Sequence, residues 1–259
     1  IVGNSGNAIL NQSAGNNSAG AIYVGNASTA VGSYNLSGGA VTSAQTRVGY
    51  YGAGSFVNSG GAHSGSTMDL GVYSGAAGSY TVSGTGTTTM TASLFVGNYG
   101  SGTFTQAGGT TNINSWTYFG YAPTGQGTMT LSGGTFNTAG MTVGLNGSGS
   151  VTHTGGSNRI INNRDLIVGA AASGSYTLSN GSLSTNNEIV GYGSNGTFHQ
   201  LSGTHTVANM LTVGGTDKGT GSFTLDGGSL SATSILNNGN FIQNGGSISG
   251  SLTNNVTFI

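Results

Sequence analysis

Charged side chains are nearly absent from this sequence, and their scarcity excludes several kinds of protein. Only 3% of the 259 residues are charged, with four Lys and Arg residues in all and a formal net charge of -1. Nucleic-acid binding needs several basic side chains to neutralise phosphates, so we expect no nucleic-acid partner. Disordered chains combine low hydrophobicity with high net charge, whereas 35% of this chain is hydrophobic. The composition therefore predicts a chain that folds and buries apolar side chains.

Cysteine is absent as well, which excludes disulfides and thiolate metal sites. A chain without cysteine also suits passage through an oxidising compartment. No apolar run approaches the roughly 18 residues that a membrane-spanning helix requires, so we expect no membrane insertion. We expect an extracellular or cell-surface location.

Glycine is abundant instead, and its positions reveal a repeat. An aliphatic or aromatic residue followed by Gly recurs ten times, from Val2-Gly3 to Val213-Gly214, with successive Gly residues 22 to 26 residues apart. Each unit holds three short runs that alternate apolar and small polar residues, which is the periodicity of β-strands, and Gly at their ends permits sharp corners. We therefore predict an all-β fold, a single-stranded right-handed parallel β-helix (β-solenoid) with about 10 to 11 coils and three short strands per coil. Residues 1–259 are expected to form a single domain.

Alignment of the units predicts a ladder of rings inside the solenoid. Stacked rings bury large areas and stabilise one another. The aromatic members of the predicted core ladder are Tyr34, Phe56, Tyr80, Phe104, Tyr176, Phe198, Phe223 and Phe241, with Met129 and Val151 in the same column. Two residues further on, the column mixes aliphatic residues with Asn58, Gln106 and Gln200. We expect these amides to bond to backbone groups at a corner or to their neighbours.

The acidic residues do not form an enzyme-like group. The repeat alignment scatters Asp69, Asp165, Glu188, Asp217 and Asp226 over different positions. Only Asp165 and Glu188, in adjacent coils, are close enough in the alignment to resemble a glycosidase pair, and an ion pair of Arg164 with one of them is the preferred interpretation. Glu188 occupies an inward position, so we expect a bulge or register shift there.

Other residues likewise fail to form a chemical site. The four histidines, at positions 63, 153, 199 and 205, have no metal-ligand spacing. Asp217-Lys218-Gly219 lacks the repeated acids of calcium sites. The Thr-rich run 87–91 would indicate ice binding only if the same Thr column recurred over many coils, and the aligned units show no such regularity. We expect no catalytic, cofactor or metal site.

A tyrosine cluster at one corner is the main candidate surface. Tyr50, Tyr51, Tyr73 and Tyr99 follow the repeated corner Gly on three consecutive coils. Exposed aromatic rows commonly contact a partner. Two interpretations stay open, namely corner packing that stiffens the turn and contact with glycans or a cell-surface polymer.

The repeat units resemble those of a known group of proteins. The clearest copy is 94–97 (Leu-Phe-Val-Gly) followed by 102–106 (Gly-Thr-Phe-Thr-Gln), and the pattern covers nearly the whole chain. It resembles the β-strand repeats of bacterial autotransporter passenger regions and of Gly-rich secreted proteins with PEP-CTERM-type sorting signals. The resemblance implies a right-handed parallel β-helix on, or released from, the cell surface, serving in adhesion, matrix or display.

The two ends of the sequence carry the last candidate site. Natural solenoids usually close their ends with caps, and neither terminus here resembles one. Ile1, Val2, Phe258 and Ile259 are the candidate end-to-end interface between copies of the chain. We expect a non-catalytic structural filament, with an adhesin that uses the tyrosine corner as the alternative and a polysaccharide-degrading enzyme as the weakest reading.

Overall fold

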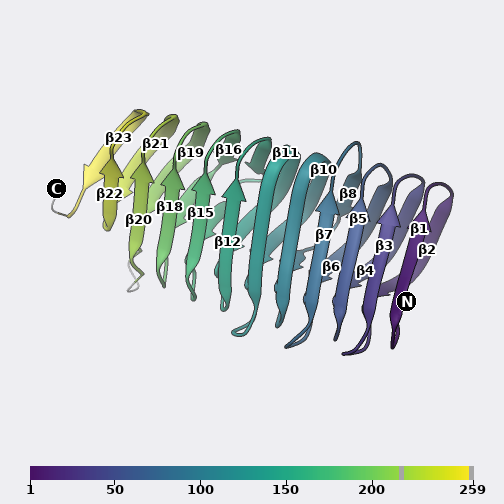
Figure 1. The fold of residues 1–259 in the computed structure, drawn as a ribbon. Helices are drawn as coiled ribbons and strands as arrows, with labels where there is room; N and C mark the ends of the chain where they lie inside the picture. Colours follow the sequence, from purple (N-terminus) through teal and green to yellow (C-terminus); the bar gives the residue numbers. More distant parts are fainter. Residues whose placement is uncertain (216–218, 257–259) are drawn as a thin grey trace.

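The chain is a parallel β-solenoid, which confirms the predicted fold class. The computed structural model describes residues 1–215 and 219–256. The strands pair only in parallel and stack as about ten turns, consistent with the predicted right-handed winding. Figure 1 shows the turns side by side from the purple N-terminal end to the yellow C-terminal end. Nowhere in the described ranges does the chain form an apolar helix of membrane-spanning length.

Each turn contains three strand segments, and we name the surfaces that they form faces A, B and C in chain order. Face A consists of β1 (Asn7–Gln12), β3 (Val31–Leu36), β5 (Ala53–Asn58), β7 (Ala77–Val82), β12 (Ser148–His153), β15 (Gly174–Leu178), β18 (Gly196–Gln200), β20 (Gly221–Leu225) and β22 (Asn240–Gln243), with the first parts of β10 (Ser101–Phe119) and β11 (Gln126–Val143). These strands face the viewer in Figure 1.

Faces B and C form the remainder of each turn. Some strands run through both faces, namely β2 (Asn16–Val24), β4 (Ala40–Val48), β6 (Ala62–Leu70), β19 (Thr204–Val213), β21 (Ser229–Asn237) and β23 (Ser247–Asn254). Elsewhere face B consists of β8 (Thr87–Met90), β13 (Ser157–Ile160) and β16 (Ser182–Thr185), and face C of β9 (Leu94–Val96), β14 (Asp165–Val168) and β17 (Asn187–Val190). The long strands β10 and β11 pass through all three faces of one turn, with register shifts where the faces meet.

Glycine makes the corner between faces C and A. Gly49 has a φ of 67°, and a Cβ there would lie 2.2 Å from the carbonyl oxygen of Ala77 in the next turn. On the inner side of the same corner, a Cβ at Gly54 would lie 2.3 Å from the amide nitrogen of Gly49. Only Gly allows this left-handed backbone together with so close an approach of two neighbouring turns. The repeated Val-Gly therefore marks the point where each turn closes on its neighbour.

Candidate functional site

The residues predicted for the core ladder lie in one column inside face A. Strand register joins Tyr34 to Phe56, Phe56 to Tyr80 and Tyr80 to Phe104, and their rings stack with centroids 4.6, 5.0 and 5.7 Å apart. The second group is Tyr176, Phe198, Phe223 and Phe241, with successive centroids 5.0, 4.8 and 5.1 Å apart. All eight side chains are buried. The ladder is thus two stacks of four rings.

The two stacks are separated where the column carries smaller residues. Met129 and Val151 occupy this position on two consecutive turns, paired in register with each other and with the rings above and below. Phe136, on face B, fills part of the space and meets Phe104 edge-on at a centroid distance of 5.4 Å. The interior therefore stays packed although the ring column is interrupted.

The amides two residues beyond the ladder bond to the backbone at the corner between faces A and B. Gln106 Nε2 donates to the carbonyl oxygens of Thr135, at 2.8 Å, and Gly109, at 3.3 Å. Gln200 Nε2 makes the same pair of bonds, to Ser229 at 3.1 Å and Gly203 at 3.3 Å. Each amide thus joins its own corner to the next turn, which satisfies buried carbonyl groups.

The bulge predicted at Glu188 is wrong. β17 pairs with β14 and β19 without a register shift, and the Glu188 side chain points inward and is fully buried. Its Oε2 lies 2.8 Å from Nε2 of His205, which is also fully buried on face B. The strand stays regular because a partner from across the interior meets the carboxylate. Within the described residues, the other oxygen of Glu188 and Nδ1 of His205 have no hydrogen-bond partner.

Two other buried histidines link the interior through tyrosine hydroxyls. His63 lies 2.8 Å from the hydroxyl of Tyr80 and 2.9 Å from that of Thr46, and burial lowers the pKa of His63 to about 3. His153 lies 3.0 Å from the hydroxyl of Tyr176, and burial lowers its pKa as well. Both rings are therefore neutral at neutral pH and serve as interior hydrogen-bonding groups.

The expected ion pair of Arg164 is also wrong. The Arg164 guanidinium lies 5.6 Å from the ring centroid of Trp116, in cation–π geometry. Asp165 instead accepts a hydrogen bond of 2.9 Å from the side-chain amide of Asn187, one turn away. Arg164 prefers the ring because aromatic side chains cluster on this part of face C. Among the described residues no group of three or more His, Asp or Glu side chains is arranged to hold a metal ion.

The tyrosine corner lies where face C turns into face A. The amide of Tyr73 donates to the carbonyl of Tyr50, and the amide of Tyr99 to that of Val72, which places Tyr51, Tyr73 and Tyr99 at equivalent positions of three consecutive turns. Their exposed fractions are 47%, 38% and 50%. Tyr51 and Tyr73 stack with centroids 4.3 Å apart and an interplanar angle of 4°. In the described part of the chain no ring stacks on Tyr99. Of the four predicted tyrosines, Tyr50, Tyr51 and Tyr73 are therefore in ring-to-ring contact.

Tyr50 fastens this cluster to the solenoid. Its ring meets Tyr51 and Tyr73 edge-on, and its hydroxyl lies 3.4 Å from that of Tyr73. This hydrogen bond and burial raise the pKa of Tyr50 to about 12. Tyr23, one turn earlier, also meets Tyr50 edge-on, and the Arg47 guanidinium lies 5.3 Å from the Tyr50 centroid. The corner is therefore a packed cluster whose outer two rings project into solvent.

Sequence reasoning missed a longer outward row on face C, although its signal is simple. The row is the residue directly before each corner Val-Gly, Leu-Gly or Phe-Gly, together with the residue in register with them on the following turn, Leu236. In register it contains Tyr23, Arg47, Asp69, Phe95, Tyr118, Thr142, Ile167, Ile189, Thr212 and Leu236. Phe95 stacks on Tyr118 at 5.4 Å, and Trp116 stacks on Tyr118 at 6.0 Å. Aromatic and aliphatic residues thus occupy six of the ten positions of this row on face C.

Asp69, in this row, gives the chain a testable pH dependence. Burial raises the pKa of Asp69, although Arg47 and a hydrogen bond from Asn98 oppose the shift. Between the ordinary and the raised pKa the folded chain binds more protons than the unfolded chain, so the free energy of unfolding falls as the pH rises. We expect this fall above about pH 4 in urea unfolding of the wild type and a smaller fall in Asp69→Asn.

Asp226 provides the control for this prediction because its shift has the opposite sign. Hydrogen bonds from His199 and Asn244 lower the pKa of this exposed carboxyl. Asp226→Asn therefore leaves the decline attributed to Asp69 in place. An Asp69→Asn variant with the full wild-type decline would contradict the assignment.

The four residues of the candidate end-to-end interface are only partly described. Ile1 is 70% exposed, whereas Val2 is buried and forms an isolated parallel bridge with Val24. Phe258 and Ile259 lie outside the described residues, as do Asp217 and Lys218 of the loop considered for calcium.

Comparison of the chain with protein-family models, with curated proteins and with solved structures found no match. The chain is a β-solenoid repeat protein by its own stacked parallel strands.

Proposed function

We propose that this chain is an extracellular structural protein whose solenoids stack end to end into a filament or matrix fibre. The observation that carries the proposal is the open strand edge at each end of the described stack. β1 and β2 pair with β3 and β4 on one side only, apart from the single bridge between Val2 and Val24, and β22 and β23 pair only with β20 and β21. Figure 1 shows these strands at the two ends.

An open parallel edge is a template for another strand of the same geometry. Further turns, in the same polypeptide or in a second copy, would continue the ladder at the spacing of about 4.8 Å that already separates neighbouring strands. A second copy supplies partly matching chemistry, because Leu10 and Phe241, and likewise Ile22 and Leu252, occupy corresponding positions of the first and last described turns. The low charge favours such association, since it leaves little repulsion between copies. Absent cysteine and the resemblance to bacterial secreted repeats support the extracellular location.

The test uses a proline on the open edge of β1. The carbonyl of Gln12 accepts a hydrogen bond from the amide of Ser37, so Gln12 faces β3. Successive residues of a parallel strand direct their backbone groups to opposite sides, which turns the amide of Ile9 toward the open side. Ile9→Pro therefore removes a donor from the edge without breaking a bond to β3. We expect filaments in electron micrographs of the wild type and isolated short rods in Ile9→Pro.

Ile9→Thr is the matched control, because it removes a similar exposed apolar surface and keeps the amide. Filaments should persist in this variant. Wild-type protein that stays monomeric at high concentration in size-exclusion chromatography and shows no filaments would refute the end-to-end proposal.

A second candidate function is an adhesin or glycan-binding module that uses the tyrosine corner. The exposure of Tyr51, Tyr73 and Tyr99 on three consecutive turns favours it. Because Tyr51 and Tyr73 stack on each other, each of them has one ring face left for a sugar. The free ring of Tyr99 offers a third platform.

A glycan array would test the adhesin candidate. Tyr73→Ala should weaken binding by about tenfold or more, since stacking of one aromatic platform contributes about 1–3 kcal/mol in comparable ring contacts. Tyr192→Ala is the control, because Tyr192 is 45% exposed but lies on a distant turn. Equal binding by the two variants would exclude the corner as the binding site.

A further inference from the structure

The outer side of face A carries two parallel columns of outward side chains, the first made only of Ser and Thr and the second of Thr with Asn35, Val57 and His199. The first column consists of Ser33, Ser55, Ser79, Thr103, Thr128, Ser150, Ser175, Thr197 and Ser222. The second, two residues further along each strand, consists of Asn35, Val57, Thr81, Thr105, Thr130, Thr152, Thr177, His199 and Thr224. Every member is at least partly exposed. Sequence analysis looked for a Thr column at 87–91 and missed this one.

The two columns form a regular two-dimensional array. No register shift interrupts the pairing of these residues across the nine turns, because the shifts between β10 and β11 lie beyond face A. Neighbouring turns are therefore about 4.8 Å apart, and residues i and i+2 of one strand are about 6.6 Å apart. The stacked rings directly beneath, such as Phe198 and Phe223 with an interplanar angle of 6°, hold the backbone in place. The hydroxyl groups thus lie at fixed, repeated positions.

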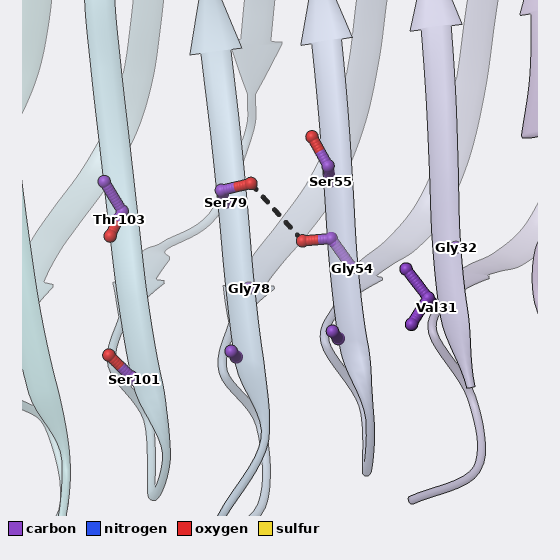
Figure 2. A pocket seen from close by; sticks show the side chains of 10 residues that line it. Val31, Gly32, Gly54, Ser55, Gly78, Ser79, Ser101 and Thr103 are labelled. Atoms are coloured by element: carbon purple, nitrogen blue, oxygen red, sulfur yellow. Dashed lines mark hydrogen bonds between the residues drawn. The ribbon is translucent and has the colours of Figure 1, made fainter. Parts of the chain in front are cut away.

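Chemistry and shape along the array suit ordered water. Neither column contains Asp, Glu, Lys or Arg. A hollow of about 310 Å³ runs beside the first column at Ser55, Ser79 and Thr103, which Figure 2 shows on neighbouring strands. A second hollow of about 380 Å³ follows the same column at Thr128 and Ser150. Small outward residues two positions before the column, such as Ala53 and Ala77, line the first hollow.

We propose that face A is an ice-binding surface. A hydroxyl both donates and accepts hydrogen bonds, and the Thr methyl groups keep the spaces between hydroxyls apolar. Water molecules held by these rows would be ordered at the two repeat spacings given above, and ordered water can join a growing ice crystal. The strict register supplies the rigidity that recognition of a lattice requires.

The other faces do not offer such an array. The outward row of face C mixes rings and aliphatic side chains with the charged residues Arg47 and Asp69. On face B the comparable outward column is broken by the long side chain of Arg159 and by the amide pair Asn112 and Asn137, joined at 2.8 Å. Sugar polymers are the nearest rival occupant, but aromatic rings that hold sugars lie on face C and at its corner, not on face A.

The experiment compares one substitution on two faces. Thr130 lies exposed in the middle of the second column, and Thr206 lies exposed on the outer side of face B. Thr130→Tyr places a bulky ring on the array, and Thr206→Tyr places the same ring elsewhere. We expect the wild type to show thermal hysteresis, to inhibit ice recrystallisation and to enter a slowly grown ice hemisphere. Thr130→Tyr should lose most of these activities, and Thr206→Tyr should keep them.

Folding and rival ligands are measured on the same samples. Circular dichroism spectra and melting curves should match among the wild type, Thr130→Tyr and Thr206→Tyr. If Thr130→Tyr does not fold, a Thr130→Ser variant is measured instead, and it should retain ice activity because it keeps the hydroxyl. Wild-type protein without ice activity would refute the proposal, as would equal loss in Thr130→Tyr and Thr206→Tyr. Retention on crystalline cellulose or chitin without retention in ice would also refute it. Filament formation is measured separately by microscopy, so a negative result for ice binding and a negative result for filament assembly can be told apart.

Discussion

Phe198→Ala is expected to lower the free energy of unfolding by about 3–5 kcal/mol, the usual cost of removing a large ring from a packed interior. Phe198 is buried between the rings of Tyr176 and Phe223, and the imidazole of His205 stacks on it at a centroid distance of 4.8 Å. Solenoid turns contact only their neighbours, so a cavity here weakens the joint between the last turns, which contain β20 and β22, and the rest of the rod. Guanidinium unfolding measures the loss.

Thr197→Ala is the control on the same strand, because Thr197 points to solvent. Its effect should stay within about 0.5 kcal/mol. Unfolding of Phe198→Ala in two separate transitions would show that the joint has become the weakest point of the stack. Equal stability of the two variants would contradict the assignment of the rings as the structural core.

The buried pair of Glu188 and His205 gives the second large effect. His205→Leu leaves the carboxylate buried without its partner, and loss of one member of a buried pair costs about 3–5 kcal/mol. The double variant Glu188→Leu with His205→Leu should be as stable as the wild type or more so, because well-packed apolar residues often replace a buried pair without cost. The column context favours this outcome, since Leu166 and Leu211 flank position 188.

Position 205 is flanked in the same way, by Leu183 and Leu230. The double-mutant cycle, measured by chemical denaturation near neutral pH, separates the interaction free energy of the pair from the effect of each single substitution. A double variant that is less stable than His205→Leu alone would show that the pair is more than a replaceable interior contact. Wild-type stability in His205→Leu would show that the carboxylate needs no partner.

The spacing of Val-Gly and of the rings was sufficient to predict the ladder, because each turn contributes one residue to a column and the columns are parallel. The error at Glu188 has a physical reason. Its partner His205 reaches it from another face of the same solenoid, and an alignment of repeats shows neighbours along the axis but not across the interior. The inward position of Glu188 was therefore predicted correctly, whereas the bulge was not.

Outward residues were harder to predict than inward ones. Tyr50 and Tyr51 are adjacent in sequence, yet Tyr50 is anchored by Tyr23 of the preceding turn and by Arg47 of its own turn, while Tyr51 projects outward. Which of two neighbouring tyrosines is held depends on the corner geometry. Likewise, the hydroxyl columns of face A appear only when strand register is known, because Ser and Thr also punctuate the turns throughout the sequence.

The different chemistry of the three faces has a mechanical consequence. Hydroxyls extend along face A, whereas outward rings gather on face C and its corner between Tyr23 and Tyr118, and the strand register keeps each kind of side chain on its own face. A rod that settles on a solid therefore has a preferred underside. Bundles or layers of such rods would all expose the same remaining side, so a coat made from this one polypeptide would have two unlike surfaces.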